Sequence, residues 1–425
     1  MTHPTLLITG ARLADGRRTD LLLAGGRLAD PASAPAGVET LDADGLLALP
    51  GLVDLHTHLR EPGREDAETV RTGTLAAARG GYTAVLAMAN TNPVTDTAEA
   101  AEHVAALGRR DGAAQVVPVG AVTKGLAGEQ LAELGLMARS SAAVRVFSDD
   151  GSCVHDSRLM RRALEYVRAF DGVVAQHAQD PRLAGPDACC HEGEVSGRLG
   201  LGGWPAVAES TVVARDVQLA RLTRSRLHVC HVSTAETVEV LRWAKAQGIA
   251  VTAEVTPHHL LLTTDAVLGY DPVFKVNPPL RPDEHVQALR QGLADGTIDA
   301  VGTDHAPHAR HDKEHAFADA AFGMLGLETA LGVLVETMVE PGLLSWSDLV
   351  ERMSATPARI AGLAEQGRPL AVGEPANLVL VDPTRRTIVD PADSFSLSRN
   401  NPYAGRELPD PVEATFWQGR PTFRR

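Results

Sequence analysis

Two histidines separated by one residue, His56 and His58, are the first side chains along the chain that could do chemistry. They follow the apolar run of residues 51–55. If this run is a strand, its period of two directs both imidazoles to one face at the strand end, where they can bind one metal ion. An isolated His-x-His pattern is equally compatible with two surface histidines, so the chain must supply further ligands.

Histidine and aspartate recur at the ends of four further apolar runs, at Asp150, His177, His231 and Asp304. Three or four imidazole and carboxylate ligands make one zinc-type site, whereas six ligands with a shared carboxylate make two. Each residue alone is compatible with a polar strand end that a loop satisfies. Six such residues at corresponding places favour a site for two metal ions.

The elements that must position these ligands lie between residues 51 and 365, where an apolar strand, a polar loop and an amphipathic helix alternate. The predicted strands end at His56, Asn90, Gly120, Asp150, His177, His231, Glu254 and Asp304. Eight such units predict an α/β fold of the (β/α)8 TIM barrel type, whose active site lies at the C-terminal ends of the strands. All the candidate ligands would then face one mouth of the barrel.

The two ends of the chain predict a second, smaller domain. Residues 1–50 contain short apolar runs bounded by Gly, Asp and Pro, and the same pattern returns at residues 376–383 and 413–419. Such runs are typical of strands. We therefore expect residues 1–50 and 366–425 to form one small β-sandwich domain, with the catalytic barrel of residues 51–365 inserted between its two parts.

Composition restricts the class of partner. The formal net charge of −14 argues against nucleic acid or an anionic membrane, and favours a small-molecule substrate. No run approaches the ~20 apolar residues of a membrane span, and the start of the chain has no basic region followed by an apolar core, so we expect a cytoplasmic protein. The four cysteines form no Cys-x-x-Cys pair and are expected to be reduced and structural.

Five segments resemble the dihydroorotases of the amidohydrolase superfamily, in their larger bacterial type. The segments are residues 51–63 (GLVDLHTHLREPG), 89–93 (ANTNP), 256–259 (TPHH), 275–281 (KVNPPLR) and 302–308 (GTDHAPH). His-x-His alone marks the superfamily, but the Leu-Arg-Glu-Pro-Gly and Asn-Pro-Pro-Leu-Arg stretches are specific to this branch. The resemblance implies reversible interconversion of dihydroorotate and N-carbamoyl-L-aspartate in pyrimidine (UMP) biosynthesis.

The resemblance also implies two Zn2+ ions per subunit, bridged by one carboxylate and by a water or hydroxide. By position, His56 and His58 match ligands of the more buried zinc, His177 and His231 those of the more exposed zinc, Asp150 the bridging carboxylate, and Asp304 a ligand that is also the general base. The groups that match the substrate site are Arg60, Asn90 and Asn277 for the carboxylate, and His308 with the backbone at Phe322 and Gly323 for the ring amide.

One departure from the family pattern lies in the substrate site. Where these proteins commonly read Ala-Pro-Phe-Gly, this chain has Ala at position 321, which frees φ there and adds a backbone N–H. The stretch of residues 305–322 is charged and poor in apolar residues, so we expect an active-site loop that is looser without ligand.

The proposed roles suit the chemistry of a cyclic amide. A metal pair lowers the pKa of a shared water from ~15.7 towards neutrality and polarises the carbonyl. A carboxylate at Asp304 can take a proton from the water and pass it to the leaving nitrogen. The planar guanidinium of Arg60 matches a substrate carboxylate better than a lysine would.

Two alternatives remain from the sequence. Hydantoinases, dihydropyrimidinases and allantoinases resemble this chain in fold but bridge their metals with a carboxylated lysine after strand 4, where residues 147–151 contain none. A non-catalytic dihydroorotase-like subunit of aspartate carbamoyltransferase would not need six ligands. The sequence leaves open the metal used, the oligomeric state (homodimer or homotetramer) and any complex with aspartate carbamoyltransferase.

Overall fold

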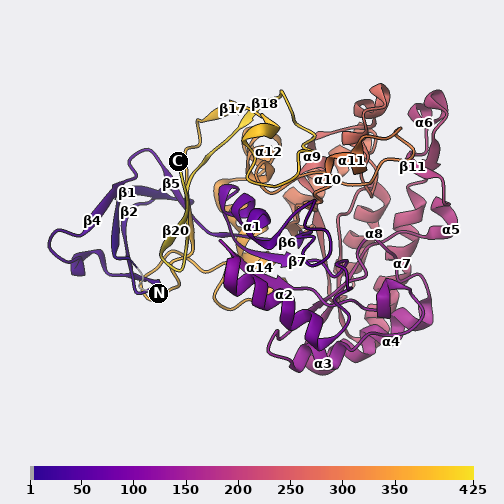
Figure 1. The fold of residues 1–425 in the computed structure, drawn as a ribbon, viewed down its shortest axis with the longest axis horizontal. Coiled ribbons are helices and arrows are strands. Elements are labelled where there is room, and N and C mark those ends of the chain that lie inside the picture. The colour runs from indigo at the N-terminus through magenta and orange to yellow at the C-terminus, as the bar shows by residue number, and fades with distance from the viewer. Residues whose placement is uncertain (1–3) are drawn as a thin grey trace.

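The computed structural model describes residues 4–425. Residues 1–3 lie outside the described range, and they belong to the start of the chain, which we expect to lack a targeting segment. Within this range no helix is long and apolar enough to cross a membrane. A small group of strands lies beside a larger body of strands and helices (Figure 1). The larger body contains the predicted site.

Eight strands of the larger body run parallel to their neighbours, as the sequence predicts. They are β6 (Leu52–Thr57), β7 (Tyr82–Ala87), β8 (Gln115–Pro118), β9 (Val146–Phe147), β10 (Val173–Gln176), β13 (Arg226–Val229), β14 (Val251–Val255) and β15 (Ala300–Val301). All residues of β6, β7 and β10 are buried, which is typical of strands covered on both faces.

Two narrow joints close these strands into a barrel. The strands form one sheet of three (β6 to β8) and one of five (β9 to β15). Single backbone bridges connect the sheets, one between Thr57 and His305 and one between Gly120 and Phe147. At the first joint the Asp54 carboxylate also accepts hydrogen bonds from the backbone and hydroxyl of Thr303 (2.8 and 2.7 Å). The predicted (β/α)8 barrel is confirmed.

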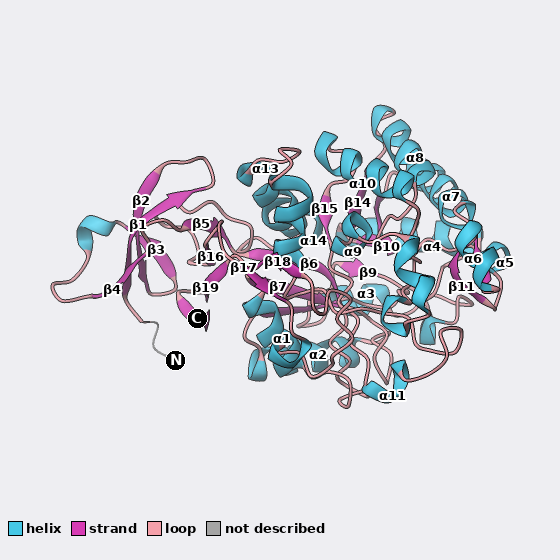
Figure 2. Cartoon of the chain, turned by 90° about the horizontal axis from the view of Figure 1, so that it is seen from above, coloured by secondary structure: helices cyan, strands magenta, loops and turns pink. Residues whose placement is uncertain are grey.

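Helices form the outer layer of the barrel (Figure 2). The longer ones are α1 (Val70–Arg79), α2 (Ala98–Asp111), α4 (Ser157–Val167), α7 (Val207–Thr223), α8 (Ala235–Ala246) and α10 (Asp283–Asp295). Helix α4 shows why they form here: Asp156 caps its first turn by accepting from the Leu159 N–H, and Met160, Leu164 and Val167 form its buried stripe.

Shorter elements complete the outer layer and the loops at the mouth. They are α3 (Leu134–Arg139), α5 (Pro181–Ala184), α6 (Glu194–Leu199), α9 (Pro257–Leu261), α11 (Arg310–Lys313), α12 (Ala330–Leu334), α13 (Trp346–Val350) and α14 (Thr356–Ala361), with the two-stranded β11 (Ala188–His191) and β12 (Gly202–Trp204). The pair β11 and β12 lies in an excursion between β10 and α7 that the sequence pattern did not indicate.

The smaller group is one eight-stranded sheet built from both ends of the chain. Its strands are β1 (Leu6–Leu13), β2 (Arg18–Ala24), β3 (Arg27–Ala29), β4 (Glu39–Asp42), β5 (Leu47–Pro50), β16 (Leu378–Val381), β19 (Val412–Trp417) and β20 (Arg420–Arg424). Strand β16 pairs antiparallel with β5, which joins the C-terminal strands to the N-terminal ones. Ile8, Leu23, Leu378 and Phe416 share one buried cluster between them.

Between β16 and β19 the chain leaves this sheet and returns to the barrel. This part contains β17 (Arg386–Ile388) and β18 (Glu407–Pro409), which Figure 1 shows beside α12. Tyr403 and Leu408 pack in one cluster with Val276 and Met324 of the barrel. The domain boundaries at residues 50 and 366 stay a prediction.

Candidate metal centre and active site

All six predicted metal ligands lie at the C-terminal mouth of the barrel, and each is at most 5% exposed. His56 is on β6 and His58 follows it; the others directly follow or lie near the ends of β9, β10, β13 and β15, and they are Asp150, His177, His231 and Asp304. Parallel strands bring their carboxyl ends to one rim, so residues distant in the sequence meet there.

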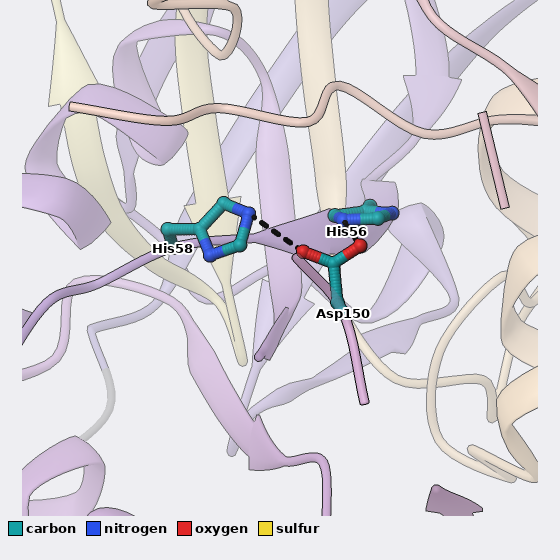
Figure 3. A group of neighbouring side chains, drawn as sticks. All are labelled: His56, His58 and Asp150. Carbon is teal, nitrogen blue, oxygen red and sulfur yellow. Dashed lines mark ion pairs between the residues drawn. The ribbon is translucent and has the colours of Figure 1, made fainter. Parts of the chain in front are cut away.

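The Asp150 carboxylate lies at the centre of four imidazoles. Its Oδ1 is 3.1 Å from His56 Nε2, and its Oδ2 is 3.3 Å from His58 Nε2 (Figure 3). Its Oδ1 is also 3.4 Å from His177 Nδ1 and 3.3 Å from His231 Nε2. Two groups of potential ligand atoms therefore share Asp150, one with His56 and His58 and one with His177 and His231.

Asp304 joins the first of these groups. Its Oδ1 is 3.2 Å from His58 Nε2 and 3.6 Å from His56 Nε2. Its backbone has φ +46°, in the left-handed region that non-glycine residues rarely adopt. Such strain is typical of functional positions.

The neighbouring Asp149 points elsewhere. Its carboxylate accepts hydrogen bonds from the backbone N–H groups of Val122 (2.8 Å) and Thr123 (2.9 Å), and from the Thr123 hydroxyl. Both residues lie in the loop just beyond β9, and only Asp150 reaches the imidazoles.

Electrostatics keep these carboxylates ionised. Burial favours the neutral acid at Asp150, but the positive charge and hydrogen bonds of the surrounding histidines outweigh it and hold the Asp150 pKa well below its ordinary value. The pKa of Asp304 is likewise low, because hydrogen bonding to His58 and the charge of His56 overcome burial. In return the Asp150 carboxylate raises the pKa of His56 against the effect of burial.

The donor set fits a transition metal. It combines ionised carboxylates with imidazoles that can bind a metal in their neutral form, and the site is buried. Such a set of ligands suits zinc and similar ions. Nε2 of His56 is buried and makes no hydrogen bond of good geometry, although Asp150 lies beside it. A metal ion would satisfy this atom.

The other ring nitrogens of the histidines have partners that orient them. Glu254 Oε1 is 2.7 Å from His56 Nδ1, Asn90 Oδ1 is 2.9 Å from His58 Nδ1, and Gln179 Oε1 is 3.0 Å from His177 Nε2. Such partners fix the tautomer and the ring orientation of a ligand histidine. Sequence reasoning placed Glu254 at a strand end but gave it no role, and missed Gln179.

Glu254 is fully buried and depends on a glycine beside it. Its Oε2 lies 3.3 Å from His228 Nε2, so the carboxylate bridges His228 and His56. A Cβ at Gly302 would lie 2.3 Å from Glu254 Oε2, closer than real contacts allow. Glu254 lies within β14, and its place at the end of an apolar run showed its position in the sequence but not its partners.

Arg60 lies at the rim of the site with its guanidinium directed to the loop after β15. It is half-buried, its Nε donates to Pro307 O (3.0 Å), and burial lowers its pKa to about 10, so it stays cationic near neutrality. Among residues 4–425, no carboxylate lies within ion-pair distance of Arg60. Asn277 donates to Gln179 Oε1 (3.2 Å), and its own Oδ1 is buried without a hydrogen-bond partner in that range.

The groups expected to bind a ring amide lie together on the same side of the site. His308 Nε2 donates to Phe322 O at 2.7 Å, which makes the 3.4 Å contact between Arg60 and the same nitrogen a close approach only. Burial and the nearby Arg60 cation lower the pKa of His308 to about 3, so the ring is neutral. A side chain at Gly323, where φ is +144°, would collide with His308.

Ala321, where the family commonly has proline, makes a backbone hydrogen bond that a proline could not make. The Ala321 N–H, which a proline would lack, donates to Asp312 O at 3.0 Å. Lys313 Nζ donates to Ala321 O (2.7 Å) and Gly323 O (3.1 Å), and Phe317 is only 3% exposed. Phe317 is thus one apolar anchor in a stretch that is otherwise poor in them, and the expectation that residues 305–322 are looser without ligand stays a prediction.

Comparison with known proteins gives the family. The profile described as Dihydro-orotase-like matches residues 45–237. The chain is 60% identical to the dihydroorotase of Leifsonia xyli subsp. xyli over 424 residues, which cover 99% of this chain and 97% of that one. The chain belongs to the dihydroorotase family. The dihydroorotases of Streptomyces coelicolor (60% identity, 98% and 97% coverage) and Mycobacterium tuberculosis (55%, 99% and 98%) are similar to it as well.

Solved structures show that the fold extends beyond dihydroorotases. The L-hydantoinase (dihydropyrimidinase) from Arthrobacter aurescens is 26% identical, with a TM-score of 0.87 over 100% of this chain and 96% of that one. The dihydropyrimidinase from Brevibacillus agri, at 22% identity and a TM-score of 0.86, shares the fold. None of the four lysines belongs to a potential metal-ligand group in the described range, and Lys124, the nearest in sequence, is exposed.

Proposed function

We propose that this chain is a dihydroorotase, which reversibly hydrolyses (S)-dihydroorotate to N-carbamoyl-L-aspartate in pyrimidine biosynthesis. The observation that carries the choice of substrate is Arg60. A partly enclosed guanidinium beside the metal ligands, with no carboxylate of the described chain paired to it, favours a substrate that brings its own carboxylate. Hydantoin and dihydrouracil have none.

The metal ligands in this proposal are six residues that hold two Zn2+ ions. They are His56, His58, Asp150, His177, His231 and Asp304, with Asp150 as the bridge. When bound, the metal pair supplies an acidified water and polarises the substrate carbonyl. Glu254, Asn90 and Gln179 hold the histidine rings in the orientation this requires.

Asp304 moves the proton. Its low pKa keeps it ionised before hydrolysis, so it can accept the proton of the attacking water and deliver it to the ring nitrogen as the amide bond breaks. In ring closure the same carboxylate starts protonated and the sequence reverses. One residue serves both directions in opposite protonation states.

The substrate is oriented from two sides. In this proposal the N–H groups of Arg60, Asn90 and Asn277 donate to the substrate carboxylate, which only accepts hydrogen bonds. In this proposal His308 and the backbone at Phe322 and Gly323 bind the ring amide. Fixing both ends holds the reacting carbonyl in one position.

Ultraviolet-monitored turnover of dihydroorotate, hydantoin and dihydrouracil by the purified protein tests this function, with metals counted in the same sample. We expect turnover of dihydroorotate only, with about two metal ions per chain. Turnover of hydantoin in preference would assign the chain to the hydantoinases. Full folding with no metal and no turnover would favour a non-catalytic subunit of aspartate carbamoyltransferase.

We further propose that the enzyme acts in the cytoplasm on its small-molecule substrate. Light scattering of the protein, alone and mixed with aspartate carbamoyltransferase, distinguishes a monomer from a homodimer, a homotetramer and a mixed complex.

A further inference from the structure

A segment near the C-terminus, residues 394–401, contacts the loops on both sides of the first joint, one after β6 and one after β15. On the β6 side, the Leu397 N–H donates to Glu68 Oε1 (3.0 Å) and the Ser398 hydroxyl donates to Ala67 O (2.6 Å). Glu68 in turn lies 3.3 Å from His305, the residue after Asp304. We name residues 394–401 the crossover segment.

On the β15 side, one side chain of the crossover segment connects two stretches of backbone. Asn400 Oδ1 accepts from the His308 N–H (3.2 Å), and its Nδ2 donates to Ala306 O (2.9 Å) and Gly323 O (3.1 Å). The backbone carbonyl of Asn400 also accepts a hydrogen bond from the Leu325 N–H (3.1 Å). Asn400 is 7% exposed, so water replaces these bonds poorly if they are lost.

The two stretches that Asn400 connects carry the groups proposed to bind the ring amide. His308 reaches its partner Phe322 O across the gap between them, and Gly323 lies against the same imidazole. His308 and Asn400 also line one cavity of about 460 Å³, together with Lys313 and Ser398. The two stretches also pair directly at one point, where the Ala306 N–H donates to Met324 O (2.8 Å), and among the described residues of the C-terminal part only Asn400 bonds to both.

We propose that Asn400 is a positioning residue for substrate recognition, which sets the distance between His308 and Gly323 and so the fit of the ring amide. The proposal rests on the proposed function for the identity of the ring. It assigns a substrate-related role to a segment that enters from the C-terminal part of the chain. Only an amide meets all three contacts, because one backbone N–H and two carbonyls require an acceptor and a donor on the same group.

Two variants separate positioning from mere filling of space. Asn400→Asp keeps the shape and the acceptor but loses both donors and directs a carboxylate at two carbonyl oxygens. Asn400→Ala removes all three bonds. Asn401→Ala is the matched control, since Asn401 has the same 7% exposure and its side chain accepts only from the nearby Tyr403 N–H (2.9 Å) among the described residues.

Kinetics of the metal-loaded enzyme give the first readout. We expect Asn400→Asp to raise KM for dihydroorotate and Ki for orotate about tenfold, more than Asn400→Ala does, with kcat and metal content nearly unchanged. Succinate has two carboxylates and no ring amide, so its Ki as a competitive inhibitor should stay within about twofold. Equal losses for orotate and succinate, or a harmless Asn400→Asp, would overturn the proposal.

Amide hydrogen exchange gives a second readout that does not depend on turnover. In Asn400→Asp, peptides that contain His308 and Leu325 should exchange faster than in the wild type, while Asn401→Ala leaves the exchange of these peptides unchanged. Unchanged exchange would refute the positioning role even if KM rose. If the wild type failed to turn over dihydroorotate, the proposed function would fall, and the exchange result would still decide whether Asn400 holds these loops.

Discussion

Asp149 and Asp150 are adjacent in the chain but serve different parts of the structure. Asp150 lies among four imidazoles, whereas Asp149 accepts two backbone N–H groups of the neighbouring loop. We expect Asp150→Ala to lose metal and activity while remaining folded. Asp149→Ala should keep its metal but lose about 2–3 kcal/mol of stability, because two buried donors lose their acceptor.

Metal counting by emission spectroscopy and urea unfolding measure the two effects separately. Loss of metal in Asp149→Ala together with retention in Asp150→Ala would reverse the assignment of the bridging carboxylate.

Glu254 gives a pH dependence whose sign follows from its environment. Burial alone would raise its pKa, but hydrogen bonds from His228 and His56 lower it from 4.5 to about 2. Since the folded-state pKa is the lower one, this carboxylate adds stability that is complete above about pH 4.5 and is lost as the pH falls towards about 2.

In urea unfolding of the metal-free protein, Glu254→Gln should therefore be less stable than the wild type by about 3 kcal/mol near pH 6. The difference should shrink as the pH falls from about 4.5 to about 3. A difference that stays constant over that range would mean that the cost arises from packing and not from the charge of Glu254.

At the scale of elements, the loop after β6 presents Arg60 to the mouth. Arg60→Met should lower kcat/KM for dihydroorotate by about 2–4 kcal/mol, mainly through KM, because a charge-assisted bidentate contact is lost. Metal content should not change, since Arg60 is not a ligand. Arg60→Lys should recover only part of the loss, because an ammonium lacks the planar fork.

Steady-state kinetics with metal analysis on each variant provide the test. If Arg60→Met loses its metal, Arg60 supports the structure of the site and the proposed carboxylate contact is wrong.

The elements that could be predicted from the sequence are those with a local pattern. The apolar runs before His177 and His231 lie on strands, and their position at one rim follows from the barrel. Glu254 and Asn400 could not be assigned because their partners lie far away in the sequence, on other strands and loops. The anchoring of Phe317 was missed for the same reason, since a single aromatic residue in a charged loop has no period to reveal its burial.

At the scale of the whole molecule, Asp410 links the barrel to the C-terminal strands. Its carboxylate accepts two hydrogen bonds from Arg79 of α1 (2.8 and 3.0 Å) and pairs with Arg425. Asp410→Ala should cost about 3–5 kcal/mol in urea unfolding, because it leaves a largely buried Arg79 without its counter-charge.

The exposed pair of Arg27 and Glu365 is the control for this prediction. Both side chains are more than half exposed, so Glu365→Ala should cost less than about 1 kcal/mol. Similar losses in the two variants would show that burial does not decide the strength of these ion pairs.

The overall topology was predictable because both chain ends repeat one strand pattern, and β16 does pair with β5. The return of residues 386–409 to the barrel was not predictable. Its strands β17 and β18 are three residues each, too short to show a period, and its buried Tyr403 and Leu408 are isolated in the sequence.

The narrow joint between β6 and β15 also determines how the barrel resists a pulling force. A force that pulls the first barrel strand away from the last is carried there by one backbone bridge and by the Asp54 carboxylate, where a full strand pair would share it over several bonds. His58 and Asp304 stand on opposite sides of this joint. A metal ion held by both would carry part of the load, so the work needed to stretch a single molecule open would rise with metal occupancy.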